Sequence, residues 1–205
     1  MNLKNHWERV YTSNSTEKLG WYKPHLKVSL EWIEGLDLNK DFRIIDVGGG
    51  ASSLVDDLLR LGYRSITVLD ISKNALDLAK RRLQEKADQV TWLAMNICSA
   101  DLPIQGYELW HDRAVFHFLT QEGDRKKYLD NLYLSVMPGG YLIMAVFAPE
   151  APPKCSGLPV QRYNLDDLIQ EIGEGFTLMR HQKELHVTPG GVEQMYLYCL
   201  FNRRL

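Results

Sequence analysis

The sequence predicts an α/β fold with one open, mostly parallel, doubly wound sheet, and three observations support this class. Short apolar segments alternate with segments whose apolar residues recur at helical spacing. Segment 43–52, RIIDVGGGAS, joins a short apolar strand to three consecutive glycines. A second apolar segment, 65–69, is closed by Asp70 about 20 residues after the glycines, which is the spacing of a βαβ nucleotide-binding unit.

Length and composition fit one domain, 1–205. The chain is 45% hydrophobic and 24% charged, as is usual for a soluble globular protein. Its formal net charge of -2 does not indicate binding to a polyanion such as a nucleic acid. No apolar run approaches the length of a membrane span. We therefore expect neither a nucleic-acid nor a membrane partner. The oligomeric state stays open.

The first residues lack the apolar core of a secretory signal, and the three cysteines are far apart. Cys98, Cys155 and Cys199 suit reduced thiols better than a disulfide framework or a zinc site. These features predict a cytoplasmic protein without a metal centre.

The helices follow from periodicity and from end signals. Segment 1–24 is polar and aromatic, and we expect it to form a cap or lid over a site. Glycine ends some of the helices and Ser72 can cap another. The predicted helices are 24–35, 53–61, 72–86, 122–137 and 165–172.

The strands follow from apolar runs. Segment 141–147 is almost continuously apolar, so it should be a central strand buried on both faces. The last two segments alternate more and flank Pro189-Gly190-Gly191, which favours an antiparallel hairpin. The predicted strands are 43–47, 65–69, 89–95, 107–110, 141–147, 176–186 and 194–202.

Right-handed crossovers place the first strand in the middle of the sheet, next to the fourth. Ligands should then lie beyond the carboxyl ends of strands one, two and four. Glycines 48–50 let the backbone approach a ligand closely, and Asp70 can accept hydrogen bonds from ribose hydroxyls. Together they predict a site for an adenosine-containing cofactor.

The order of elements and four motifs resemble the class I S-adenosylmethionine-dependent methyltransferases, over about residues 41–203. Segment 46–50 looks like the family's glycine loop, and Asp70 looks like its ribose-binding acid. Segment 95–97 matches the turn after strand three, and 108–113 matches the fourth motif at the end of strand four. The resemblance implies a Rossmann-like sheet of seven strands, S-adenosyl-L-methionine as cofactor, and methyl transfer as the reaction.

The resemblance also assigns the cofactor contacts. Asp46 would lie near the cofactor's amino group, beside Gly48, Gly49 and Gly50. Asn96 stands where the family often has an Asp that contacts the adenine amine, and an amide oxygen can still accept that bond. Ile71 and Ile97 either sandwich the adenine ring or belong to the core.

Two further segments resemble particular branches of the family. Residues 108–113, ELWHDR, are similar to the thiopurine-type small-molecule methyltransferases, which carry Trp-Asp-Arg there. His6, Trp7, Tyr11 and the pair 21–22 look like the N-terminal segment of bacterial and mitochondrial relatives. Those relatives include the citrate synthase lysine methyltransferase.

A polar cluster, His111, Asp112 and Arg113, closes the fourth strand where the family presents its acceptor. His111 or Asp112 is a candidate base for the nucleophile, and His111 is also a candidate cofactor contact. The alternative is a structural ion pair between Asp112 and Arg113. The candidate lid or substrate residues are Trp21, Tyr22, His117 and Arg162. Otherwise Trp21 and Tyr22 would serve packing, His117 would face a helix, and Arg162 would be solvated.

Two other functions remain open from the residues alone. An NAD(P)-dependent oxidoreductase shares part of the glycine fingerprint, but Ser53 replaces its third glycine and Asp46 occupies a position usually apolar there. The second alternative function is that of a non-catalytic module that binds S-adenosylmethionine. No Asn/Asp-Pro-Pro-aromatic segment follows strand four, so the expected acceptor is a small molecule or a protein side chain.

Overall fold

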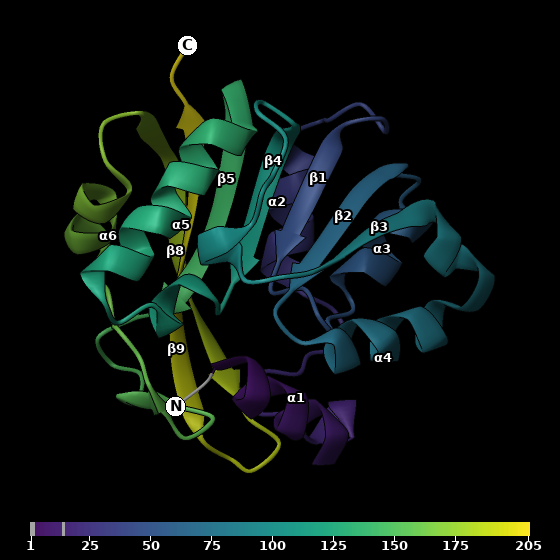
Figure 1. Ribbon diagram of the computed structural model, residues 1–205. Helices are drawn as coiled ribbons and strands as arrows, with labels where there is room; N and C mark the ends of the chain where they lie inside the picture. The colour runs from purple at the N-terminus through teal and green to yellow at the C-terminus, as the bar shows by residue number, and fades with distance from the viewer. Residues whose placement is uncertain (1–2, 14) are drawn as a thin grey trace.

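The computed structural model describes residues 3–13 and 15–205, and a seven-stranded sheet runs through them (Figure 1). The strand order is β3-β2-β1-β4-β5-β9-β8. The strands are β1 (Arg43–Val47), β2 (Ser65–Asp70), β3 (Val90–Ala94), β4 (Tyr107–Arg113), β5 (Val136–Phe147), β8 (Phe176–Val187) and β9 (Glu193–Arg203). Strands β1 to β5 pair in parallel, whereas β9 pairs antiparallel with both β5 and β8. The predicted sheet, its central first strand and its C-terminal hairpin are confirmed.

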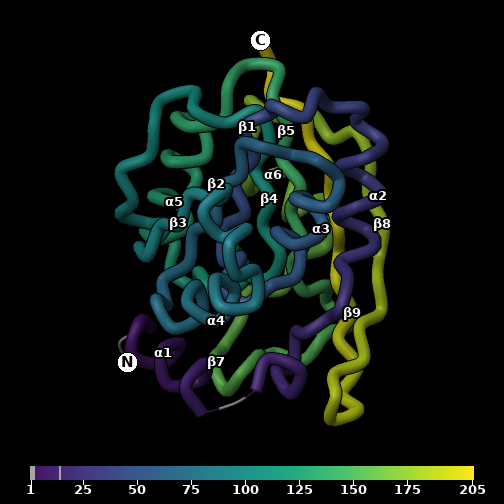
Figure 2. Tube along the Cα trace, turned by 90° about the vertical axis from the view of Figure 1, so that its right-hand side faces the viewer, coloured from purple at the N-terminus to yellow at the C-terminus, as the bar shows by residue number. Residues whose placement is uncertain are grey.

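Helices cover both faces of the sheet (Figures 1 and 2). The longer ones are α1 (Leu3–Ser13), α2 (Lys27–Gly35), α3 (Leu54–Arg60), α4 (Lys73–Leu83), α5 (Glu122–Ser135) and α6 (Leu165–Ile172). Helices α2, α3 and α4 share one apolar core with the sheet, and α5 and α6 share the other. Among the described residues, no helix is long and apolar enough to cross a bilayer.

Short elements complete the chain. The 3₁₀ turns are η1 (Thr16–Lys18), η2 (Gln84–Gln89), η3 (Ile97–Ser99) and η4 (Phe116–Phe118). A small hairpin of β6 (Lys154–Cys155) and β7 (Leu158–Pro159) lies in the loop after β5.

Segment 1–24, expected as a cap, contains helix α1, which lies beside the carboxyl ends of the parallel strands (Figure 1). Residues 1, 2 and 14 of that segment lie outside the described residues. The helix was not predicted, although Leu3, Trp7 and Tyr11 recur in it at a spacing of four.

Several predicted boundaries are wrong, among them the start of α2, which is Lys27 instead of 24, and the end of α4, which is Leu83 instead of 86. Strand β4 continues to Arg113 instead of ending at 110, so His111 and its two neighbours belong to the strand. Helix α5 ends at Ser135 instead of 137, and β5 already begins at Val136. Pro138 is tolerated there because the β4–β5 register shifts over this stretch, and a proline is allowed where ladder bonds are interrupted.

Candidate functional site

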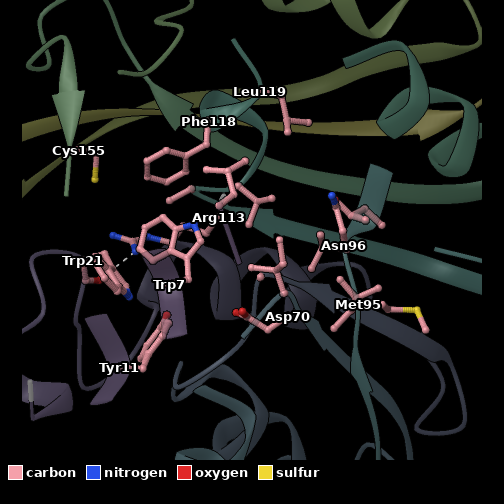
Figure 3. Close-up of a pocket in the computed structure, with 18 residues that line it drawn as sticks. Trp7, Tyr11, Trp21, Asp70, Met95, Asn96, Arg113, Phe118, Leu119 and Cys155 are labelled. Carbon is pink, nitrogen blue, oxygen red and sulfur yellow. Dashed lines mark hydrogen bonds between the residues drawn. The ribbon is translucent and has the colours of Figure 1, made fainter. Parts of the chain in front are cut away.

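A pocket opens at the carboxyl ends of β1, β2, β3 and β4 (Figure 3). It encloses about 800 Å³, counting the part that is open to solvent. Its floor is formed by Val47, Gly48, Leu69, Asp70, Ile71, Met95, Asn96 and Ile97. Its walls and roof are formed by Leu3, Trp7, Tyr11, Trp21, Arg113, Ala114, Val115, Phe118, Leu119 and Cys155. The pocket lies where the strand order predicts a ligand.

A second, smaller pocket of about 470 Å³ adjoins the first and shares Tyr11, Trp21, Gly48 and Arg113 with it. The predicted residues Asp46, Gly49, His111 and Tyr22 line this second pocket. The predicted cofactor residues, except Gly50, therefore lie around two pockets that share lining residues.

The glycine loop is shaped by its protein neighbours. At Gly48, with φ +70°, a Cβ would lie 1.9 Å from Cγ2 of Val115. At Gly49 a Cβ would lie 2.4 Å from Oδ2 of Asp46, and at Gly50 2.5 Å from Oδ2 of Asp70. Real Cβ atoms do not approach so closely, so these glycines let the loop pass directly over two carboxylates.

Asp70, the last residue of β2, is buried and borders the first pocket. Burial raises the pKa of its carboxyl to about 7, with the charges of Asp46 and Glu8 adding to the rise and the amide of Ser72 opposing it. That amide donates to Oδ1 at 2.8 Å. A buried carboxylate with capacity for further hydrogen bonds is well suited to accept a pair of ligand hydroxyls.

Asp46 and His111 face each other across neighbouring strands, in direct register. Oδ1 of Asp46 lies 2.7 Å from Nδ1 of His111, and Nε2 of His111 lies 2.9 Å from the Ser29 hydroxyl of α2. Since a carboxylate only accepts, the histidine donates from Nδ1, and when it is neutral its Nε2 accepts from the serine. Both ring nitrogens are thus engaged inside the protein.

Because side chains alternate along a strand, Asp112 points to the opposite face of the sheet from His111 and Arg113. Asp112 is fully buried on the α5 side and borders neither pocket. Its carboxylate accepts from the amides of Val115 and Phe116 and from the Tyr128 hydroxyl at 2.6 Å. The group therefore holds the turn after β4, where Ala114 adopts φ +72°.

Arg113 borders both pockets. Its guanidinium lies 4.4 Å from the Tyr196 ring centre, donates to the Tyr198 hydroxyl at 3.0 Å and donates to the carbonyl of Trp21 at 3.1 Å. The structural ion pair between Asp112 and Arg113 is absent among the bridges of residues 3–13 and 15–205. Arg113 instead fastens the cap segment to the end of β4.

Two predicted substrate residues lie away from the pockets. His117 is fully buried, and its Nδ1 accepts from the amide of Phe147 at 3.1 Å. Burial, followed by the charge of Arg113, lowers the pKa of His117 to about 3, so the ring is neutral. Arg162 donates to the carbonyls of Pro149 and Ala151, where it holds its own loop.

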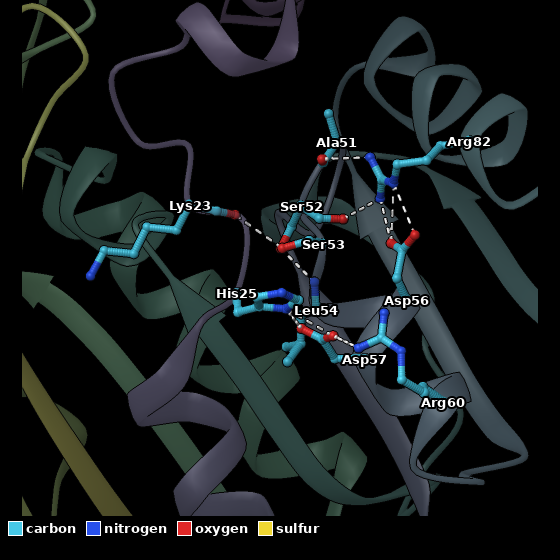
Figure 4. Close-up of polar contacts among 10 residues, drawn as sticks. All are labelled: Lys23, His25, Ala51, Ser52, Ser53, Leu54, Asp56, Asp57, Arg60 and Arg82. Carbon is cyan, nitrogen blue, oxygen red and sulfur yellow. Dashed lines mark hydrogen bonds and ion pairs between the residues drawn. The ribbon is translucent and has the colours of Figure 1, made fainter.

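Arg82 of α4 supports the glycine loop from outside (Figure 4). Its guanidinium donates to the carbonyl of Ala51 at 3.0 Å and to that of Ser52 at 2.6 Å. The Ser53 hydroxyl donates to the carbonyl of Lys23 at 3.0 Å. The loop is thereby tied to α4 on one side and to the cap segment on the other.

Several pocket residues were not assigned to the site individually from the sequence, although segment 1–24 was expected to form a cap. Leu3, Trp7 and Tyr11 form one stripe of α1 at a spacing of four, and that spacing was the available signal. Val115, Phe118, Leu119 and Cys155 enter the wall from loops, for which no periodic pattern exists.

Comparisons with known proteins agree with this geometry. Residues 44–140 match the family described as "Methyltransferase domain". The chain is 22% identical over 169 residues to EEF1A lysine methyltransferase 2 of Danio rerio, covering 80% of this chain and 66% of that protein. A SAM-dependent methyltransferase from Anabaena variabilis has the same fold, with a TM-score of 0.75, 15% identity, and coverage of 100% of this chain and 96% of the other.

A second similar structure was solved with S-adenosylhomocysteine and the enzyme's small-molecule substrate. It is the 1,6-didemethyltoxoflavin-N1-methyltransferase of Burkholderia thailandensis, with a TM-score of 0.69, 16% identity, and coverage of 98% of this chain and 84% of the other. Residues 44–140 therefore match a methyltransferase domain, the whole chain has the fold of the S-adenosylmethionine-dependent methyltransferases, and these matches imply S-adenosylmethionine as the cofactor. The oxidoreductase alternative is not supported.

The raised pKa of Asp70 predicts pH-dependent cofactor binding. The ribose hydroxyls of a bound cofactor are expected to donate to the ionised carboxylate, whereas the free protein protonates Asp70 as the pH falls through about 7. We expect the affinity for S-adenosylhomocysteine to drop about tenfold from pH 8 to pH 6. Calorimetry at both values measures it, and Asp70→Asn should flatten the dependence. An equally steep dependence in that variant would assign the proton to another group.

Proposed function

We propose that the protein transfers the methyl group of S-adenosylmethionine to a nucleophile that enters the first pocket beside Arg113. The buried carboxylate of Asp70, facing a pocket beside the glycine loop, is the observation that carries this proposal. Asp70 would hold the ribose, Ile71 and Ile97 would flank the adenine, and Asn96 would contact its amine. Oδ1 of Asn96 accepts from the amide of Cys98 at 3.0 Å, and its second lone pair remains for this contact.

The second pocket would hold the amino-acid end of the cofactor. Asp46 borders it together with Gly49 and His111, and a carboxylate suits an ammonium group. The cofactor supplies an activated methyl group, so the protein's task is to bind, to orient and to exclude water.

We propose that the acceptor is a small molecule with a flat or apolar body. Trp7 meets Trp21 and Phe118 edge-on, with ring centres 5.4 and 5.1 Å apart, so the space beside Arg113 has aromatic walls. The half-buried guanidinium of Arg113 there disfavours a second cation. The small-molecule substrate of the Burkholderia enzyme agrees with this choice.

A protein side chain is the second candidate. The Danio rerio relative is named for a lysine of EEF1A, and a lysine must lose its proton before it can attack. The positive charge of Arg113 would favour the neutral amine. The cytoplasmic location and the absence of a nucleic-acid partner remain predictions.

Calorimetry with S-adenosylmethionine, S-adenosylhomocysteine, NAD and NADP tests the cofactor site. Only the first two are expected to bind. Methyl release from labelled cofactor, measured against a metabolite panel and a protein lysate, separates the two acceptor classes. Tight binding without turnover on either panel would favour the non-catalytic module.

We propose that His111 positions Asp46. With both ring nitrogens engaged, it has no free site for a substrate proton. His111→Ala is expected to weaken S-adenosylhomocysteine binding roughly tenfold, because a charge-assisted bond to a buried carboxylate is lost. The control is His25→Ala, which breaks a similar pair with Asp57 outside both pockets. If His111→Ala binds normally but turns over slowly, the residue acts on the acceptor.

A further inference from the structure

Helix α1 presents two stripes of side chains to two different neighbours. Leu3, Trp7 and Tyr11, four residues apart, border the first pocket. Glu8 and Thr12, also four residues apart, contact the beginning of helix α4. Residues at this spacing share one helix face, so the helix roofs the pocket with one face and attaches to α4 with the next.

The attachment is centred on the Glu8 carboxylate. Oε1 accepts from the amide of Lys73 at 2.9 Å, and Oε2 accepts from the amide of Asn74 at 3.1 Å and from the Ser72 hydroxyl at 2.9 Å. The Asn74 side chain adds a bond to the Thr12 hydroxyl at 2.9 Å. A carboxylate from a distant helix thus satisfies the first free amides of α4, where the helix dipole also favours negative charge.

The charge state of Glu8 fits this role. Partial burial alone would raise the pKa of its carboxyl, but the bonds from Asn74, Lys73 and Ser72 outweigh burial and leave the pKa below its usual value. Glu8 is therefore ionised at neutral pH. An 11-residue helix is marginal by itself in water, so its place over the pocket depends on contacts of this kind.

Ser72 connects the attachment to the pocket floor. Its hydroxyl donates to Glu8, while its amide donates to Oδ1 of Asp70 at 2.8 Å. The same hydroxyl accepts from the amide of Ala75 at 3.2 Å and so caps α4. One residue thereby joins the roof helix to the carboxylate proposed to hold the ribose.

We propose that Glu8 is a positioning residue of the cofactor site, which holds α1 closed over the pocket by capping α4 and is linked to Asp70 through Ser72. The proposal rests on the cofactor site described above. Its consequence is kinetic, because a roof that opens more often releases a bound ligand faster while the floor of the site is unchanged.

The test compares Glu8→Ala and Glu8→Gln with Glu17→Gln, an exposed acid of the same cap segment that borders neither pocket. S-adenosylhomocysteine dissociation is followed by stopped-flow tryptophan fluorescence, since Trp7 and Trp21 border the pocket. We expect release roughly tenfold faster in Glu8→Ala, as for loss of a helix cap. Glu8→Gln, which keeps one accepting oxygen, should be intermediate, and Glu17→Gln should match the wild type.

Hydrogen exchange of the ligand-free proteins gives a second readout. Amides of residues 3–13 should exchange faster in Glu8→Ala, while those of β1 and β2 keep their protection. Equal release rates in Glu8→Ala and Glu17→Gln, or unchanged exchange in residues 3–13, overturn the role of Glu8. If the wild type itself fails to bind S-adenosylhomocysteine, the cofactor assignment fails, and the exchange experiment still decides whether Glu8 holds α1.

Discussion

Asp70→Asn is expected to weaken S-adenosylhomocysteine binding about 100-fold and, at the same time, to stabilise the ligand-free protein. The amide keeps an oxygen for the Ser72 bond but loses the charge that ribose hydroxyls favour, and two charge-assisted bonds of roughly 1.5–3 kcal/mol each are affected. Calorimetry measures the first effect. The opposite signs of the two effects distinguish a binding residue from a structural one.

The stability gain follows from the direction of the pKa shift. Because the folded pKa of Asp70 is raised to about 7, the folded state binds more protons than the unfolded state between about pH 4 and 7, and wild-type stability falls across that window as the pH rises. Removing the charge should therefore add about 2–4 kcal/mol to the free energy of unfolding at pH 8, and less at pH 5. Melting curves at both values test this.

The matched control is Asp77→Asn, an acid of α4 that pairs at the surface with Lys73. It should change neither the affinity nor the melting temperature measurably. A destabilised Asp70→Asn protein would show that the carboxylate supports the fold, and unchanged affinity would remove Asp70 from the cofactor site.

Gly48→Ala is expected to lower the melting temperature by roughly 5–15 °C and to weaken cofactor binding strongly. The new Cβ would lie 1.9 Å from the Val115 side chain, at a φ that non-glycine residues rarely adopt. Backbone strain and overpacking together cost about 2–5 kcal/mol. Thermal unfolding and calorimetry on the same preparation measure both effects.

The variant Gly62→Ala separates the effect of backbone strain from the effect of a steric clash with a neighbouring side chain. Gly62 has φ +87°, but a Cβ there would meet no atom within 4 Å, and the residue lies outside both pockets. This variant should show only the strain, with normal S-adenosylhomocysteine affinity. If both variants lose the same stability, the contact with Val115 is not what requires a glycine at 48.

The sheet was predictable because its signals are local and repeated. Strand β1, its glycines and the acid that closes β2 occur at a spacing that few other structures use, and β5 is continuously apolar over residues 141–147. The end of β4 was not predictable. His111, Asp112 and Arg113 are polar, and only pairing with β1 and β5 shows that they continue the strand.

The chemistry of the site was harder to predict than its place. The sequence brings Asp112 and His111 together, but strand alternation sends them to opposite faces. Glu8 and Arg82 support the site from helices far away in the chain, and their contacts exist only after the helices pack. A residue that acts through another side chain has no characteristic spacing in the sequence, so the sequence alone does not identify it.

The pairing of Asp46 with His111 also bears on how the chain finds its fold. The two residues are direct neighbours across β1 and β4, both almost completely buried. If β4 slipped by one residue, Asp112 would stand opposite Asp46, and two carboxylates would share a dry interior. The misaligned sheet would be heavily penalised, so this acid–imidazole pair selects the correct alignment of the two central strands during folding.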